Sequence, residues 1–273
     1  MSATGTQDSD AAAKASAIAR QFVAARLEMR HIPYYPGQIP ETLAQSYAIQ
    51  DIAIGRFPDE VVGWKVGGVP PAHQERLGAH RTAGVIFARN VWPASDDAVV
   101  SLPVIEDGFA AIESEFIARV GADVDPAKTV WTIDEAAQAI DKIFVGVELA
   151  GSPLATINDL GPTVSASDFG NNGGLVVGPE LENWRARLDQ VEVETVINGA
   201  SVGTGGSQSL AGGALESVRF LLEHSAGRGR PLKAGTLIST GAVTGVHRAQ
   251  IGDEAISRFK GIAEIRCSVV KAG

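Results

Sequence analysis

The stretch AIESEFIARV, residues 111–120, places two carboxylates, separated by a single residue, inside an otherwise apolar run. A short apolar run of this kind predicts a β-strand, whose side chains alternate between its two faces. Glu113 and Glu115 then project from one face together with Ile117. That face is not plainly a solvated surface, so the two acids need a structural or a functional explanation.

Short β-branched runs separated by glycine lie on both sides of this stretch, and they predict a β-rich body. The runs are VVGWKVGG (61–68), VVSLPVI (99–105), IFVGVELA (143–150), GGLVVG (173–178), VEVETVI (191–197), GTLISTG (235–241) and AEIRCSVV (263–270). The dipeptide Asn198-Gly199 predicts a tight hairpin turn after the fifth of these runs.

The N-terminal part of the chain has a helical pattern. Residues 1–9 are polar and lack a period, so we expect them to be disordered. Residues 10–60 are expected to form a helical portion that includes a second helix over 41–56. Its first helix carries one apolar stripe, made of Ile18, Phe22, Ala25 and Met29.

Two further helices interrupt the predicted strands. Thr132 and Glu135 have the spacing of a capping box, which predicts a helix that begins at Thr132. The second helix covers about 209–224 and ends near Gly227. The expected fold is therefore of the α+β class, with a mixed β-rich, metal-binding catalytic body over 61–273 behind the N-terminal helical portion.

The composition excludes several classes of partner. Lysine and arginine number 23 against 32 acidic residues, and the resulting net charge of −9 argues against a nucleic-acid or anionic-membrane surface. The single cysteine, Cys267, permits no internal disulfide and fits a reducing cytosol. No apolar signal-peptide core is visible in residues 1–10, and no run approaches the ~20 apolar residues of a membrane span. We therefore expect a cytoplasmic protein.

A third carboxylate, Glu148, lies within the apolar run IFVGVELA. An unpaired buried carboxylate costs several kcal/mol, and a hard cation such as Mg²⁺ or Mn²⁺ removes that cost. Alternatively, the three acids lie on an exposed sheet face and pair with arginines such as Arg119. The spacing alone leaves both interpretations open.

Lys65 lies among valine, tryptophan and glycine residues in VVGWKVGG. It is either a strand lysine that extends to water or an ammonium group inside a site, near an anionic substrate or in proton transfer. Two polar stretches could also contact a ligand. One precedes a strand and contains Asn172, and the other contains Thr240 at the end of a strand.

The motifs that carry these residues occur in an order and spacing that resemble a known family, although each motif alone is weak. They are GWKVG (63–67), IESEF (112–116), VGVELAGS (145–152), SDFGNNGGLVVG (167–178), VINGASVGTG (196–205) and PLKAGTLISTGA (231–242). In series they resemble the 2-keto-4-pentenoate hydratase / 4-oxalocrotonate decarboxylase family, a branch of the fumarylacetoacetase superfamily.

The resemblance implies a fold of the fumarylacetoacetase C-terminal-domain type and a divalent metal, Mg²⁺ or Mn²⁺, held by Glu113, Glu115 and Glu148. It implies that Lys65 faces the active site, where we expect it to be a catalytic residue. We also expect Asn172 and Thr240 to bind the substrate. The implied substrates are small 2-oxo or 2-hydroxy-dienoate acids from meta-cleavage of aromatic rings. The implied assembly is a homo-oligomer, and association with a pathway partner enzyme is a further expectation.

The chain departs from the family pattern at three places. Thr82-Ala83-Gly84 stands where the family often has an acid, Phe and Gly, so an acidic site residue is replaced by Thr82. Ala150-Gly151-Ser152 replaces Val-Asp-Ser, and Asp168-Phe169-Gly170 replaces Asp-Asn-Ala. The expected activity is hydration of a 2-hydroxy-2,4-dienoate. Decarboxylation of 2-oxohex-3-enedioate, C–C hydrolysis of an acylpyruvate and a non-catalytic partner subunit are the alternatives.

Overall fold

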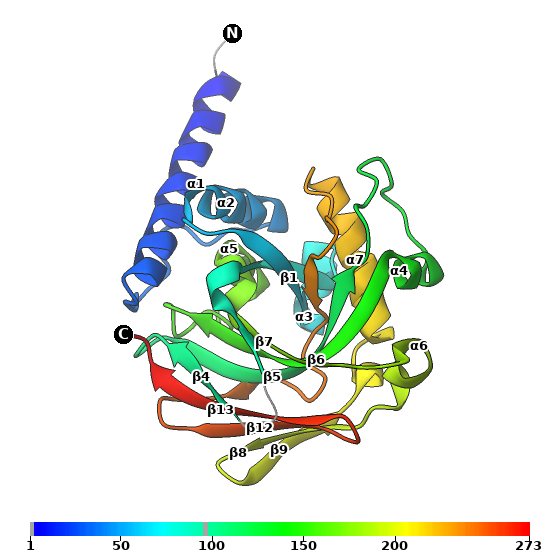
Figure 1. Ribbon diagram of the computed structural model, residues 1–273. Coiled ribbons are helices and arrows are strands. Elements are labelled where there is room, and N and C mark those ends of the chain that lie inside the picture. Colours follow the sequence, from blue (N-terminus) through cyan, green and yellow to red (C-terminus); the bar gives the residue numbers. More distant parts are fainter. Residues whose placement is uncertain (1–2, 95–97) are drawn as a thin grey trace.

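The computed structural model describes residues 3–94 and 98–273, and two β-sheets form its body (Figure 1). The larger sheet has the order β2 (Arg81–Phe87), β1 (Val61–Gly68), β10 (Leu237–Ser239), β5 (Phe109–Val120), β6 (Ile140–Ser152), β7 (Asn172–Glu180) and β3 (Val91–Pro93), with β11 (His247–Arg248) beside β5. The smaller sheet has the order β4 (Val99–Val104), β13 (Ala263–Lys271), β12 (Glu254–Phe259), β8 (Val193–Ile197) and β9 (Ala200–Gly205). Together with the helices, these sheets confirm the expected α+β class.

The two sheets pack against each other through one face of β5. Phe116 on that face is fully buried and contacts Phe259 of β12 edge to face. Ser114, also on that face, shares short hydroxyl contacts with Thr195 of β8 at 2.6 Å and Ser257 of β12 at 2.7 Å. Because strand side chains alternate, the neighbouring glutamates of β5 must point to the other face of the larger sheet.

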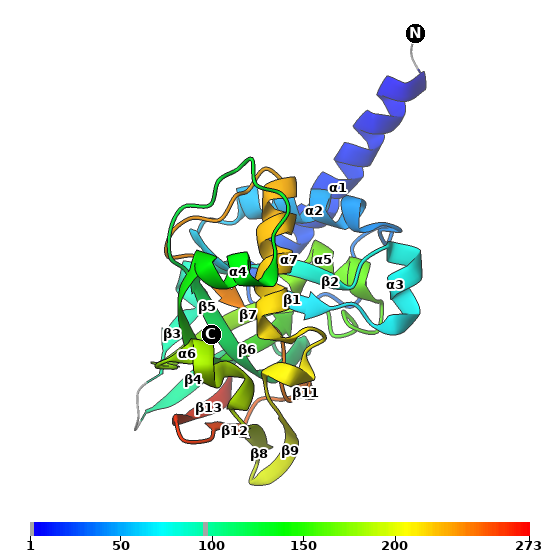
Figure 2. The same ribbon diagram turned by 90° about the vertical axis from the view of Figure 1, so that its right-hand side faces the viewer.

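Most of the helices lie on the side of the larger sheet away from the smaller one (Figures 1 and 2). They are α1 (Ala3–Leu27), α2 (Leu43–Arg56), α3 (Pro71–Leu77), α4 (Ile133–Ala139), α5 (Pro162–Ser167) and α7 (Gly213–Gly227). The short helix α6 (Trp184–Arg187) lies instead toward the smaller sheet. Short 3₁₀ turns are η1 (Ala88–Asn90), η2 (Phe169–Asn171), η3 (Leu188–Gln190) and η4 (Ser207–Ser209). Among the described residues, no helix is both long and apolar enough to cross a membrane.

The N-terminal helices differ from the expectation in two respects. Residues 3–9, which we expected to be disordered, form the first turns of α1, because each residue added to an existing helix gains a backbone hydrogen bond at little cost. Met29 lies beyond the end of α1 with a positive φ of 47° and is 43% exposed, so it does not extend the apolar stripe. The other three members of the stripe, Ile18, Phe22 and Ala25, are buried as predicted.

Several local predictions are confirmed. Thr132 and Glu135 form the predicted capping box at the start of α4. A second capping box, which was not predicted, joins Thr42 and Gln45 at the start of α2. Asn198-Gly199 connects β8 and β9 with positive φ values at both residues. The division at residue 60 between a helical portion and a β-rich body stays a prediction.

Candidate metal centre and cleft

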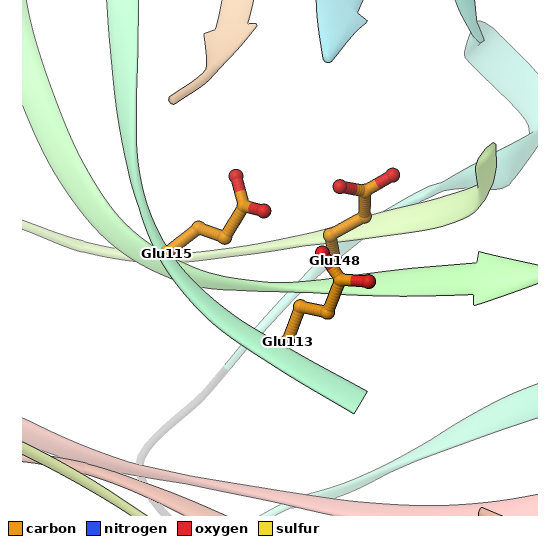
Figure 3. Close-up of side chains that lie close together, drawn as sticks. All are labelled: Glu113, Glu115 and Glu148. Carbon is orange, nitrogen blue, oxygen red and sulfur yellow. The ribbon is translucent and has the colours of Figure 1, made fainter. Parts of the chain in front are cut away.

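The glutamates of β5 and β6 converge on one face of the larger sheet. Glu113 lies directly opposite Glu148 in the antiparallel pair of β5 and β6, and Glu115 lies opposite Gly146. Figure 3 shows the three side chains directed toward one another, and each offers a carboxylate oxygen within 4.8 Å of the others. Strand alternation and cross-strand register therefore bring together acids that are 33 to 35 positions apart in the chain.

All three carboxylates are buried. The exposed fraction is 5% for Glu113 and 0% for both Glu115 and Glu148. The alternative of an exposed acidic face is therefore wrong. Arg119, its proposed partner, binds Asp141 at 2.6 Å instead, because it lies near the end of β5 beside the start of β6.

The hydrogen bonds of the cluster leave one oxygen open on each of two carboxylates. Glu115 Oε2 accepts from Ser239 Oγ at 2.6 Å and from the Gly241 backbone N–H at 2.7 Å. Glu148 Oε1 accepts from the Asn172 side-chain amide at 2.9 Å. Glu115 Oε1 and Glu148 Oε2 are buried and accept no well-directed hydrogen bond in the described part of the chain, although the Lys65 ammonium lies 3.3 Å from Glu148 Oε2. Buried oxygens with no donor are what a cation would satisfy.

Lys65 is the cation of the cluster. It lies on β1, next to Ser239 of β10 and opposite Gly84 of β2. Its Nζ lies 3.3 Å from Glu148 Oε2, and the residue is 7% exposed, so it does not extend to water. Three ionised carboxylates and one ammonium leave two negative charges uncompensated. One bound divalent cation would compensate these two negative charges.

The acid–base properties of these groups follow from burial and mutual charge. Burial raises the pKa of Glu113 to about 7, with Lys65 opposing the shift. Burial, together with the charges of Glu148 and Glu113, raises the pKa of Glu115 well above its usual value. Burial lowers the pKa of Lys65, but the carboxylates, Glu148 first, outweigh it and the net shift is upward. Lys65 is therefore an ammonium group, and the raised pKa values of Glu113 and Glu115 favour their protonated forms when no further cation is bound.

Two glycines bring the η2 turn close to Lys65. A Cβ on Gly84 would lie 2.1 Å from the Phe169 carbonyl oxygen, and one on Gly170 would lie 2.5 Å from the Gly84 Cα and 3.2 Å from Lys65 Cδ. Gly170 also has a positive φ of 67°, which a side chain would disfavour. The close contact of η2 with β2 thus depends on the absence of side chains at both positions.

A cleft of about 700 Å³ opens from this cluster. Glu113, Lys65 and Thr240 line it, whereas the other two glutamates lie behind its wall. The Thr240 hydroxyl donates to the Phe116 carbonyl oxygen at 2.9 Å. Thr82, which stands in the place of the expected acid, also lines the cleft.

The adjacent residues Asn171 and Asn172 occupy different positions relative to the cleft. Asn172 does not line the cleft, because its amide is directed to Glu148. Asn171 lines the cleft instead, and its Oδ1 has no hydrogen-bond partner among the described residues. Asn171 has a positive φ of 64°, which turns the chain between the two residues. No sequence signal in Asn-Asn distinguishes these roles.

Arg26 of α1 is a site residue that the sequence interpretation missed. Its guanidinium binds both carboxylate oxygens of Asp168, at 2.6 and 2.8 Å, and donates to the backbone carbonyls of Asn172 and Gly151. It therefore holds the segment that presents Asn172 to Glu148. The available signal was an arginine four positions after Phe22, on the buried stripe of the helix.

The chain is similar to proteins of known families over most of its length. Residues 79–270 match the fumarylacetoacetate (FAA) hydrolase C-terminal family. A 2-keto-4-pentenoate hydratase from Paraburkholderia xenovorans is 27% identical over 230 residues, which cover 81% of each protein. A 4-oxalocrotonate decarboxylase from Pseudomonas putida is 26% identical over 270 residues, which cover 93% of this chain and 96% of the relative.

Two solved structures share the fold. The structure of 4-oxalocrotonate decarboxylase from Pseudomonas putida G7, complexed with magnesium and adipate, aligns with a TM-score of 0.79 at 24% identity, over 94% of this chain and 97% of its own. Fumarylpyruvate hydrolase from Pseudomonas aeruginosa, in complex with Mn²⁺ and pyruvate, aligns with a TM-score of 0.58 at 16% identity, over 76% of this chain and 88% of its own.

Proposed function

The chain belongs to the fumarylacetoacetate hydrolase C-terminal family, and on that premise we propose that it is a metal-dependent hydratase. Its reaction adds water to a 2-hydroxy-2,4-dienoate of the 2-oxo-4-pentenoate type and gives a 4-hydroxy-2-oxo acid, in the catabolism of aromatic compounds by meta-cleavage. The observation that carries the proposal is the buried cluster of Glu113, Glu115 and Glu148 beside Lys65 on the wall of a cleft.

The donor set suits a hard divalent cation, Mg²⁺ or Mn²⁺. Its donors are all carboxylate oxygens, and one of them, Glu115 Oε1, is buried with no hydrogen-bond partner in the described residues. Glu113, Glu115 and Glu148 would hold the ion. When bound, the cation supplies a Lewis acid for the 2-oxo acid group and stabilises negative charge that develops on its oxygens.

Lys65 serves as the cationic partner of the substrate. The carboxylates keep it protonated, so it binds an anionic oxygen of the substrate. Its ion pair with Glu148 fixes Nζ at the edge of the cluster, facing the cleft. Ketonisation moves the proton of the 2-hydroxyl group to C5 and gives the 2-oxo-3-enoate, whose C4 is electrophilic. Water then adds its hydroxyl group to C4 and its proton to C3.

The other residues position these groups. Asn172 orients Glu148 through its amide, and Arg26 fixes the backbone that carries Asn172. Ser239 and Gly241 fix Glu115 by donating to one oxygen and leaving the other free. Thr240, which lies between Ser239 and Gly241 in the chain, lines the cleft and is the proposed contact for the substrate.

Decarboxylation of 2-oxohex-3-enedioate is the second candidate. The similarity to the 4-oxalocrotonate decarboxylase of Pseudomonas putida, over 93% of this chain, favours it as much as the similarity to the hydratases favours hydration. The same cluster would serve both reactions, because each needs an electron sink at the 2-oxo acid.

The test is a spectrophotometric assay of purified protein with Mg²⁺. We expect the absorbance of the 2-hydroxydienoate to decay, EDTA to stop the decay, and Glu113→Gln to abolish it. A coupled assay for CO₂ with 2-oxohex-3-enedioate separates the two candidates. Unchanged dienoate absorbance at saturating Mg²⁺ would rule out the hydratase, and CO₂ release in the same preparation would support the decarboxylase.

A further inference from the structure

Side chains of α2 cover the free edge of the larger sheet. β2 is an edge strand, and alternate residues of such a strand turn their backbone N–H and C=O away from the partner strand. Ala83 is one of these residues. Its N–H donates to the Tyr47 hydroxyl at 3.0 Å, and its C=O accepts from Gln50 Nε2 at 3.0 Å. All three residues are buried, so α2 satisfies two backbone groups that are closed to water.

Gln50 also joins β2 to α5. Its Nε2 donates a second hydrogen bond to the Ala166 carbonyl oxygen at 2.8 Å, and its Oε1 accepts from Arg228 Nη1 at 3.1 Å. A carboxamide has two N–H donors, and Gln50 uses both on backbone carbonyls of different elements. Two acceptors on one side and a guanidinium on the other leave one orientation for the amide. Gln50, which is 0% exposed, is thus a bridge between β2 and α5.

The two bridged segments meet beside Lys65. Gly84 follows Ala83 in β2 and lies opposite Lys65 of β1. Ala166 lies in the last turn of α5, which leads into η2. A Cβ on Gly170 of η2 would lie 2.5 Å from the Gly84 Cα and 3.2 Å from Lys65 Cδ. The backbone of η2 therefore lies against both β2 and the side chain of Lys65.

The carboxylate cluster is held by other contacts. The three glutamates extend from β5 and β6, and their hydrogen-bond donors lie on β7, on β10 and in the segment that follows β10. Arg26 separately holds Asp168 and the backbone of Asn172. Gln50 does not line the cleft and donates to none of these groups. Its two hydrogen bonds therefore act on the lysine side of the site rather than on the glutamates.

We propose that Gln50 is a positioning residue, which holds β2 and η2 together and thereby fixes Lys65 at the cleft wall. The inference rests on the proposed function for the role of Lys65 toward the substrate. Without the donors of Gln50, two buried carbonyl oxygens lose their partner, and β2 and η2 move apart to reach water. A displacement of about 1 Å at a group that binds the substrate can cost about 100-fold in rate. The same displacement moves an ammonium group away from the metal site, so it does not weaken binding of a cation.

The test uses two substitutions at Gln50. Gln50→Leu removes every hydrogen bond of the amide, and Gln50→Glu keeps the length and the contact with Arg228 but, when ionised, has no donor. We expect both to lower kcat for the dienoate by about 10- to 100-fold without weakening Mn²⁺ binding in calorimetry. In a Lys65→Met background, the same substitutions should change the residual kcat by less than about 2-fold. Gln50→Glu serves where Gln50→Leu does not fold.

Asn198→Ala is the matched control. It also removes a carboxamide that makes two hydrogen bonds, one to Asp253 at 2.8 Å and one from the Glu254 N–H at 3.0 Å, in the turn between β8 and β9. This turn does not line the cleft. We expect Asn198→Ala to lower stability while kcat stays normal, which separates a general loss of stability from the positioning of Lys65.

An equal loss of kcat in the native and Lys65→Met backgrounds would overturn the inference, and so would a loss of Mn²⁺ affinity in step with kcat. Crystal structures of the Gln50 variants give a test that needs no activity. We expect a wider separation of Gly84 from Gly170 and a displaced Lys65 Nζ, and unchanged positions of both would overturn the inference. An inactive native protein would contradict the proposed function alone, because the crystal structures would still decide whether Gln50 positions Lys65.

Discussion

Glu113 on β5 and Glu148 on β6 are directly opposed in the antiparallel strand pair, and both are buried. Cross-strand neighbours on one face have Cβ atoms about 5 Å apart, so two ionised carboxylates at these positions repel each other strongly. Lys65 offsets part of this repulsion, and added protons or a bound cation would offset the rest.

Removal of one carboxylate should weaken metal binding sharply. Glu148→Gln removes a charged ligand and should lower the affinity for Mn²⁺ by at least about 100-fold, since a neutral amide oxygen is a poorer ligand for a hard cation. Isothermal titration calorimetry measures the change. Glu106→Gln is the control, because Glu106 is exposed and pairs with Lys271 far from the cluster. Equal Mn²⁺ affinities in the two variants would contradict the ligand assignment.

The stability of the metal-free protein should fall as the pH rises. The pKa of Glu113 is about 7 in the folded protein, above its ordinary value of 4.5, so its contribution to the free energy of unfolding is complete below pH 4.5 and is lost as the pH rises through about 7. In EDTA, the native protein should lose stability relative to Glu113→Gln between about pH 5 and about pH 8. Urea unfolding at several pH values measures the difference, and saturating Mg²⁺ should remove it. If the free energies of unfolding of the two proteins in EDTA changed equally with pH, the pKa of Glu113 would not be raised in the folded protein.

Arg26 should act as a positioning residue with a large effect on stability. Arg26→Ala leaves the buried Asp168 without its partner, and removal of one member of a buried ion pair costs about 3–5 kcal/mol. The double variant Arg26→Leu with Asp168→Asn should recover part of that loss but not the metal affinity, because the backbone of Asn172 stays unfixed. Chemical unfolding and Mn²⁺ titration measure the two effects, with Arg20→Ala on the exposed side of α1 as the control. Normal stability of Arg26→Ala would refute the account.

The two adjacent asparagines should have separable effects. Asn172→Leu removes the donor to Glu148 Oε1 and should weaken metal binding about 10- to 100-fold. Asn171→Ala changes the cleft wall and should raise KM for the dienoate while metal affinity stays normal. Steady-state kinetics at several Mn²⁺ concentrations separates the two variants. If Asn171→Ala weakened metal binding as much as Asn172→Leu, the assignment would be wrong.

The sequence predicted most of the fold because the determining signals are local. The apolar runs, the Asn198-Gly199 turn and the capping box at Thr132 each act over a few residues, and the structure confirms them. The end of α1 was misjudged at Met29, because a continuing apolar period is compatible with a helix that stops at Leu27. Helix boundaries depend on tertiary contacts that the period does not encode.

The site was predictable only in part. Alternation places Glu113 and Glu115 on one face, but the register that sets Glu148 opposite Glu113 is a long-range property of two strands. For the same reason, the pattern left a surface pairing with Arg119 open. Arg26 was missed because its partners lie 125 to 146 positions away in the chain.

The measurement that tests the central claim most directly is anomalous diffraction from crystals of the protein soaked with Mn²⁺. The account predicts an anomalous peak among the carboxylates of Glu113, Glu115 and Glu148, and no peak there in crystals of Glu148→Gln. An active protein whose bound manganese lies elsewhere, with these three carboxylates free of the ion, would contradict the account.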